Sequence, residues 1–101
     1  MKESVFQKKV IDDLKKQFPG CMVLKNDANY IQGIPDLMVV HKDKWAALEV
    51  KKSEEAYKAS LEDQPIQTHY ISKMNNMSYA SYIYPENKEE VFNELQQTFE
   101  R

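Results

Sequence analysis

Two carboxylates and a lysine near the middle of the chain are the residues best suited to chemistry. Asp36 follows the dipeptide Ile34-Pro35, and one residue separates Glu49 from Lys51. Side chains alternate between the two faces of a strand, so Glu49 and Lys51 would project from the same face. A lone Glu-x-Lys is common on surface strands, and it acquires functional meaning only if a further group lies beside it.

A predicted hairpin supplies that further group. Residues 34–40 and 45–50 are two apolar runs separated by a charged stretch, which predicts two strands joined by a turn. A two-residue turn at 42–43 would place Asp36 opposite Glu49, where the Cβ atoms of facing residues lie about 4.5–5.5 Å apart. A three-residue turn, or a β-bulge near the start of the first strand, would change this register.

Two carboxylates at that separation point to a cation. They repel each other unless positive charge intervenes, and Lys51 supplies only part of it. Hard divalent cations such as Mg²⁺ prefer oxygen ligands, and two carboxylates with a backbone carbonyl form a suitable set. Such a site suits phosphodiester hydrolysis, because the metal polarises the phosphoryl oxygen and lowers the pKa of a bound water. Lys51 would orient or activate that water and offset negative charge in the transition state.

The surrounding sequence predicts a single α/β domain over residues 1–101. Apolar residues recur every four positions in the first segment, which predicts an amphipathic helix ended by Pro19-Gly20. Asn87 and Glu90 resemble a capping box that opens a final helix. The polar segment 52–63 is interpreted as a mobile loop or a frayed helix. The expected order is αβββαβα, with helices at 3–18, 65–76 and from 87 onward, and strands at 21–24, 34–40, 45–50 and 79–84.

The two motifs of the hairpin resemble those of a known nuclease superfamily. Gly33-Ile34-Pro35-Asp36-Leu37 followed by Leu48-Glu49-Val50-Lys51 is similar to the motif pair of PD-(D/E)XK nucleases. The closest resemblance is to compact VRR-NUC domains, including stand-alone versions encoded by phages, and it covers nearly the whole chain. It implies a restriction-endonuclease-like αβββαβ(α) core, with a mixed four-stranded sheet flanked by helices.

The resemblance also implies roles for individual residues. Asp36 and Glu49 would be metal ligands, the Val50 carbonyl a further ligand, and Lys51 the catalytic lysine. Glu3, at the start of the first helix, matches a glutamate that reaches the metal site in such domains. A helix-terminal carboxylate favoured by the macrodipole is the alternative interpretation of Glu3. In the helix that begins at Pro65, Gln67 matches the family's glutamine, with Gln64 as the competing assignment.

The predicted function is that of a Mg²⁺-dependent DNA endonuclease in which Mn²⁺ can substitute. By family analogy the substrate would be branched DNA such as a four-way junction, and one site per chain would then require a homodimer. Lys52 and Lys58 either contact the DNA backbone or belong to a solvated connector. Two alternatives stay open: a non-catalytic nucleic-acid-binding module on the same fold, and a protein–protein interaction domain with a structural salt-bridge cluster.

Composition limits the other function classes. The 101 residues carry a net charge of −2, which argues mildly against a dedicated DNA binder, although bound cations would restore positive charge locally. One cysteine, Cys21, and two separated histidines provide no zinc spacing. No apolar run approaches the roughly 18 residues of a membrane helix, and no signal-peptide pattern is present. We therefore expect no membrane partner and a cytoplasmic location, in the host cytoplasm if the protein is phage-encoded.

Overall fold

Four short strands form one mixed sheet. The computed structural model describes residues 1–101 and places the strands in the order β1-β2-β3-β4. The first three strands are antiparallel neighbours, and β4 pairs with β3 in parallel. This arrangement confirms the predicted α/β domain with a mixed four-stranded sheet flanked by helices. The strands are β1 (Met22–Lys25), β2 (Leu37–His41), β3 (Lys44–Val50) and β4 (Tyr79–Ile83).

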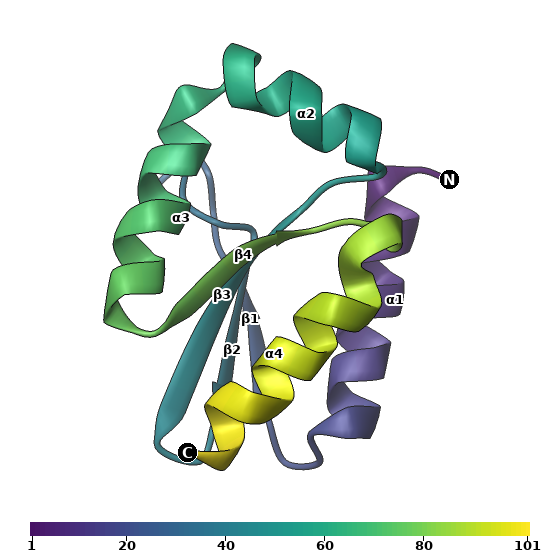
Figure 1. Ribbon diagram of the computed structural model, residues 1–101, viewed down its shortest axis with the longest axis vertical. Helices are drawn as coiled ribbons and strands as arrows, with labels where there is room; N and C mark the ends of the chain where they lie inside the picture. Colours follow the sequence, from purple (N-terminus) through teal and green to yellow (C-terminus); the bar gives the residue numbers. More distant parts are fainter.

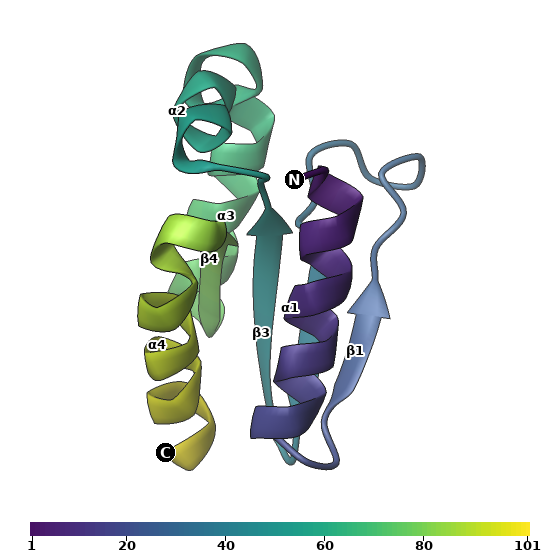
Figure 2. The same ribbon diagram turned by 90° about the vertical axis from the view of Figure 1, so that its right-hand side faces the viewer.

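Two amphipathic helices, α1 (Glu3–Gln17) and α4 (Lys88–Glu100), cover one face of the sheet (Figures 1 and 2). Both carry apolar residues on a helical period, so one stripe of each helix turns toward the sheet. The sheet contributes the inward-facing residues of its central strands, and together they form one core. The core includes Phe6, Val10 and Leu14 of α1, Leu37, Val39, Leu48 and Val50 of the sheet, and Val91, Leu95 and Phe99 of α4.

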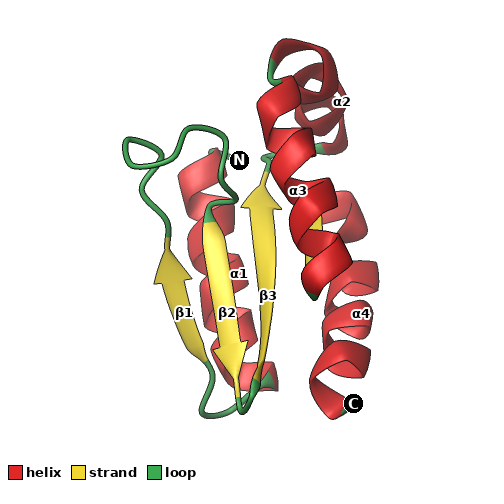
Figure 3. Ribbon diagram, turned by 90° about the vertical axis from the view of Figure 1, so that its left-hand side faces the viewer, coloured by secondary structure: helices red, strands yellow, loops and turns green.

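The opposite face carries α3 (Pro65–Met77), which lies beside β3 and β4 and leaves β1 and β2 uncovered (Figure 3). The Thr68 and Tyr82 hydroxyls, 2.9 Å apart, are hydrogen-bonded and tie α3 to β4. The Tyr57 ring packs edge-on against Tyr82, with ring centroids 4.8 Å apart, and stacks on Tyr84 at 5.0 Å. These contacts fasten the connection between β3 and β4 to the edge of the sheet.

The segment predicted as a mobile loop or a frayed helix is a regular helix, α2 (Glu54–Asp63). Ser53 caps its amino terminus, since the Ala56 amide donates to the Ser53 Oγ at 3.0 Å. Tyr57 anchors α2 to Tyr82 of β4 and to Tyr84 just after this strand. The connection between β3 and β4 therefore contains two helices where the sequence predicted one.

One predicted boundary and one predicted helix cap are wrong for identifiable reasons. The second strand begins at Leu37 rather than residue 34, because Pro35 has no amide hydrogen and its carbonyl accepts from Asn26 Nδ2 at 2.7 Å. The capping box at Asn87 does not form. The Asn87 side chain instead accepts a hydrogen bond from the Tyr84 amide and donates one to the Tyr82 carbonyl, which fixes a 3₁₀ turn over residues 85–87.

None of the helices is both long enough and apolar enough to cross a membrane. Cys21 is partly buried against the core, and its thiol donates weakly to the Leu14 carbonyl.

The two glycines of the chain provide a matched test of how the loop before β2 is held. Both have positive φ, +87° at Gly33 and +90° at Gly20, so alanine at either site should cost about 1 kcal/mol in backbone strain. Only at Gly33 would the added Cβ meet another residue, 2.7 Å from Ile66 Cγ2. We therefore expect Gly33→Ala to lower the free energy of unfolding further, by roughly 1–3 kcal/mol more than Gly20→Ala.

Urea unfolding of the two variants measures the difference. Gly33→Ala combined with Ile66→Ala should recover part of the loss, since the smaller side chain makes room for the new methyl group. Equal costs at the two glycines would show that the loop and α3 are not in tight contact.

Candidate active site

The register of the β2–β3 hairpin brings the two candidate carboxylates together. His41 pairs with Lys44 across a two-residue turn, in which Lys42 adopts a φ of +60°. The pairing runs to Leu37 opposite Leu48, so the next facing residues are Asp36 and Glu49. The predicted register is thus confirmed from His41 opposite Lys44 to Leu37 opposite Leu48. Asp36 lies just beyond the last pair, and the hydrogen bond from the Val50 amide to its Oδ2 places it beside the end of β3.

Asp36 is held in place by the backbone of β3 and by the segment after β1. Its Oδ2 accepts a hydrogen bond from the Val50 amide at 2.9 Å, and its carbonyl accepts from the Asn26 amide at 2.8 Å. Since a strand residue directs its N–H and C=O to the same side, the Val50 carbonyl is expected to face Asp36 as well. The Asp36 carboxylate therefore accepts the hydrogen bond of a β3 amide at the point where the backbone pairing of β2 with β3 ends.

Glu49 and Lys51 form a buried pair at the end of β3. They are 3% and 6% exposed, and Lys51 Nζ lies 3.6 Å from Glu49 Oε2. Glu49 Oε1 is buried and has no hydrogen-bond partner. Burial raises the pKa of Glu49 to about 8, and the negative charge of Asp36 adds to this effect, while Lys51 opposes it. One lysine does not offset two desolvated carboxylates, so Glu49 retains a proton near neutral pH when no other cation is bound.

The environment of Asp36 differs from that of Glu49. Burial raises the pKa of Asp36 as well, but the Val50 amide, a hydrogen bond with Glu49 and the charge of Lys51 all favour its ionised form. Several groups thus favour the ionised form of Asp36, whereas the pKa of Glu49 is raised to about 8, so the proton retained near neutral pH is assigned to Glu49. The pair titrates as a coupled unit rather than as two independent acids.

Glu3 approaches this pair from the first turn of α1. Desolvation raises the pKa of its carboxyl, and the next largest cause is repulsion from Asp36, with Lys51 and Lys52 acting in the opposite direction. Its carboxyl is thus close enough to sense the hairpin charges. However, no group of three acidic, histidine or cysteine side chains lies close enough to hold a metal ion. Glu3 is near the site without completing a three-ligand cluster.

Gln67 lies in the first turn of α3, at the same end of the sheet. Its Nε2 donates to Gln64 Oε1 at 2.6 Å, while its Oε1 is buried without a partner. No hydrogen bond joins Gln67 to Asp36, Glu49 or Lys51. The two glutamines line a polar hollow of about 430 Å³ between α3 and the loop that precedes β2.

Two residues that the sequence analysis did not single out support the pair. Asn26 braces the Pro35-Asp36 segment through its amide and its side chain. Tyr82 faces Glu49 from β4 in the parallel register, and its hydroxyl is bonded to Thr68. A polar residue directly after the first strand was the available signal for Asn26. Tyr82 had none, because its position depends on how β4 pairs.

The two lysines proposed to contact DNA lie beside the site and differ in their partners. Lys52 directly follows Lys51 and is exposed, and its positive charge acts to lower the pKa of Glu3. Lys58 lies on α2 and forms an exposed ion pair with Glu54 at 3.7 Å. Its charge is thus partly offset within its own helix.

The donor set at the hairpin is chemically suited to a hard cation. It consists of two carboxylates and a backbone carbonyl, all oxygen donors, and one carboxylate oxygen lacks a partner. The coupled carboxyl groups also supply the negative charge that such an ion requires.

Comparison of the chain with protein-family models, with curated proteins and with solved structures finds no match.

The raised pKa of Glu49 makes a prediction about stability in EDTA. In the unfolded chain this carboxyl ionises near its ordinary pKa of 4.5, whereas burial in the folded protein raises that pKa to about 8. Proton binding thus stabilises the fold fully below pH 4.5, and that contribution is lost as the pH rises through 8. Relative to Glu49→Gln, the wild type should lose on the order of 2–4 kcal/mol between pH 5 and 8.5.

Chemical denaturation at several pH values measures this difference, with both proteins in EDTA. Glutamine retains the shape of a protonated glutamate but does not titrate, so groups away from the site contribute equally to both curves and the difference between them reports the Asp36–Glu49 pair. Parallel curves for the two proteins would contradict the assignment of the retained proton to Glu49.

Proposed function

We propose that this protein is a metal-dependent DNA endonuclease with a restriction-endonuclease-like fold. The observation that carries the proposal is the placement of Asp36 at the end of the β2–β3 pairing, beside the buried Glu49 and Lys51. The same three residues carry the resemblance to the PD-(D/E)XK motif pair. Geometry and motif therefore support one centre at the end of the hairpin.

The energetics favour a catalytic centre over a structural salt-bridge cluster. A cluster that served stability alone would pair its buried charges, because an unsatisfied buried acceptor costs about 1–3 kcal/mol. Here two carboxylates share one lysine, and Glu49 Oε1 has no partner. Such unfavourable groupings of ionisable residues are typical of functional sites.

Asp36, Glu49 and the Val50 carbonyl would hold Mg²⁺, or Mn²⁺ in its place, and Glu3 is a further candidate ligand. When bound, the ion would polarise the phosphoryl oxygen, lower the pKa of a coordinated water and stabilise developing negative charge. Glu49 must release its proton to act as a ligand, so binding would be coupled to proton release and weaken at low pH.

The chain's own residues have separate roles in this proposal. The Val50 amide donates to Asp36, which favours the ionised form of this carboxyl against the effect of burial and holds it at the end of β3. Lys51 would hold and orient the attacking water and offset the charge that develops on the phosphoryl oxygens. Gln67 is proposed as an additional polar group beside the scissile phosphate, where its unpartnered Oε1 would accept a hydrogen bond from a water.

The substrate preference and the assembly rest on the family resemblance. Branched DNA such as a four-way junction is the proposed substrate, and cutting it symmetrically requires two sites and hence a homodimer. Lys52 and Lys58 remain proposed backbone contacts at the mouth of the site.

A cleavage assay tests the proposal. Labelled duplex, flap and four-way-junction DNA would be incubated with the protein in Mg²⁺, in Mn²⁺ and in EDTA. We expect metal-dependent cleavage, and Lys51→Ala should slow it by about 10²–10⁴-fold, the usual contribution of a positioned proton-transfer group. Lys44→Ala is the matched control, since Lys44 lies at the opposite end of the same strand.

Each outcome separates the competing functions. A folded protein that binds DNA but cuts none of the substrates with either metal would support the non-catalytic binding module. A protein that neither binds nor cuts DNA would support the third function, that of a protein–protein interaction domain. Equal loss of activity in the two lysine variants would remove Lys51 from the catalytic centre.

A further inference from the structure

Charged side chains are distributed unevenly among the helices, although the whole chain has a net charge of only −2. Both α2 and α4 are acidic, each with four acidic residues and one lysine, whereas α3 has one lysine and no acidic residue. The first helix and the residue before it differ from all of these. They carry five exposed lysines: Lys2, Lys8, Lys9, Lys15 and Lys16.

Three of these lysines form a row along α1. Lys2, Lys9 and Lys16 are seven residues apart, and a straight helix drifts only about 20° over each such interval. The row therefore lies on one side of the helix, with Cα atoms about 10.5 Å apart and a total length of about 21 Å. Lys8 and Lys15 form a second row on the exposed surface, parallel to the first.

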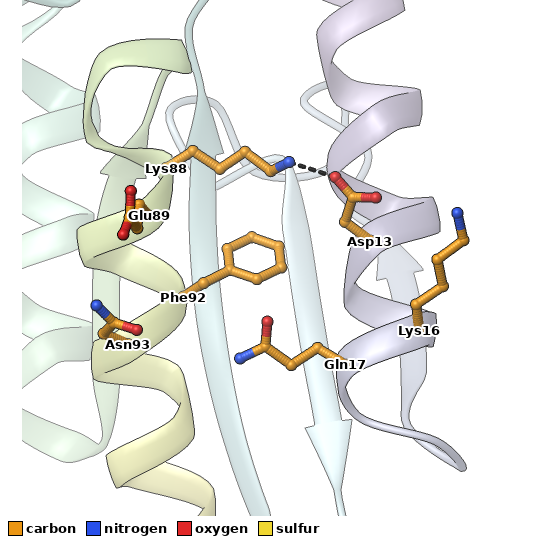
Figure 4. Close-up of a pocket in the computed structure, with 7 residues that line it drawn as sticks. All are labelled: Asp13, Lys16, Gln17, Lys88, Glu89, Phe92 and Asn93. Carbon is orange, nitrogen blue, oxygen red and sulfur yellow. Dashed lines mark hydrogen bonds and ion pairs between the residues drawn. The ribbon is translucent and has the colours of Figure 1, made fainter.

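The acidic residues of α1 offset only part of this charge, since Asp12 and Asp13 stand against five exposed lysines and Asp13 interacts with Lys88 as well as with Lys9 and Lys16. Asp13 forms an ion pair with Lys88 of α4, across a pocket between the two helices (Figure 4). Lys16 lies on the far side of Asp13 from α4 in the same view. Glu3 interacts with the charges of the candidate active site. Asp12 is then the one acidic residue on the exposed surface of α1 that interacts neither with that site nor with α4.

The row begins at the candidate active site. Lys2 precedes Glu3, whose carboxyl senses the charges of Asp36 and Lys51. Figure 2 shows the amino terminus of α1 beside the end of β3, with the helix running from there along the length of the sheet. A chain of phosphates that leaves the hairpin carboxylates and passes the end of β3 onto the α1 side of the sheet would therefore meet Lys2 first and Lys9 next.

From this placement we infer that the exposed surface of α1 binds the sugar–phosphate backbone of DNA as it leaves the site. The inference rests on the proposed nuclease function and adds the direction in which the substrate lies. A row of about 21 Å matches about six base pairs at 3.4 Å per step, and ammonium groups bind phosphates without reading sequence. The acidic surfaces of α2 and α4 would repel the same backbone.

Binding of fluorescein-labelled four-way-junction and duplex DNA tests the inference, with Ca²⁺ in place of Mg²⁺ and with salt varied. The row variant changes Lys2, Lys9 and Lys16 to Gln. The charge-matched control changes the exposed residues Lys25, Lys42 and Lys73 to Gln. Loss of three phosphate contacts should lower the slope of log K against log salt by about 2–3, at roughly 0.9 per contact, while the control should leave it nearly unchanged.

Cleavage kinetics in Mg²⁺ give a second readout. The row variant should show a raised KM and a nearly unchanged kcat, because its lysines lie outside the reacting centre. If the wild type binds and cuts DNA while the row variant and the control behave alike, the α1 surface is excluded and the nuclease function stands. If the wild type neither binds nor cuts DNA, both proposals fail together.

Discussion

The register of the β2–β3 hairpin is the constraint on which the candidate site depends. A shift of one residue would turn Asp36 or Glu49 to the other face of the sheet, where α1 and α4 pack. The two-residue turn at Lys42 and the pairing of Leu37 with Leu48 exclude that shift. Because Leu37, Leu48 and Val50 belong to the core, the energy that fixes the register comes from hydrophobic burial on the face opposite the carboxylates. The core thereby keeps two repelling groups together.

Local contacts then set the different electrostatic properties of the two carboxylates. The Val50 amide favours the ionised form of Asp36, whereas Glu49 is more completely buried and faces both Asp36 and Lys51. The result is one anchored carboxylate and one whose charge depends on what else is bound. An arrangement that is unfavourable for stability is suited to binding a cation, since the ion removes both the repulsion and the unsatisfied oxygen. The nuclease proposal explains why such a pair would be retained.

The charge distribution shows how a net charge of −2 is compatible with the proposed polyanionic substrate. The acidic residues are concentrated on α2, on α4 and at the site, while the exposed surface of α1 is basic. A net charge averages over these surfaces and carries no information on how they are divided. On the proposed function, positive charge lies where the backbone would run, and negative charge lies where cations would be held.

The sequence by itself determined the elements whose signals are local. Helical periodicity predicted α1 and α4, strand alternation and turn length predicted the register of Asp36 and Glu49, and these depend only on neighbours along the chain. The tertiary structure decided the burial of Glu49, the brace from Asn26, the helical state of α2 and the side-chain bonds of Asn87. Each of these depends on which distant group replaces water around a residue. Periodicity records which side chains leave water, but it does not identify the partners that they meet.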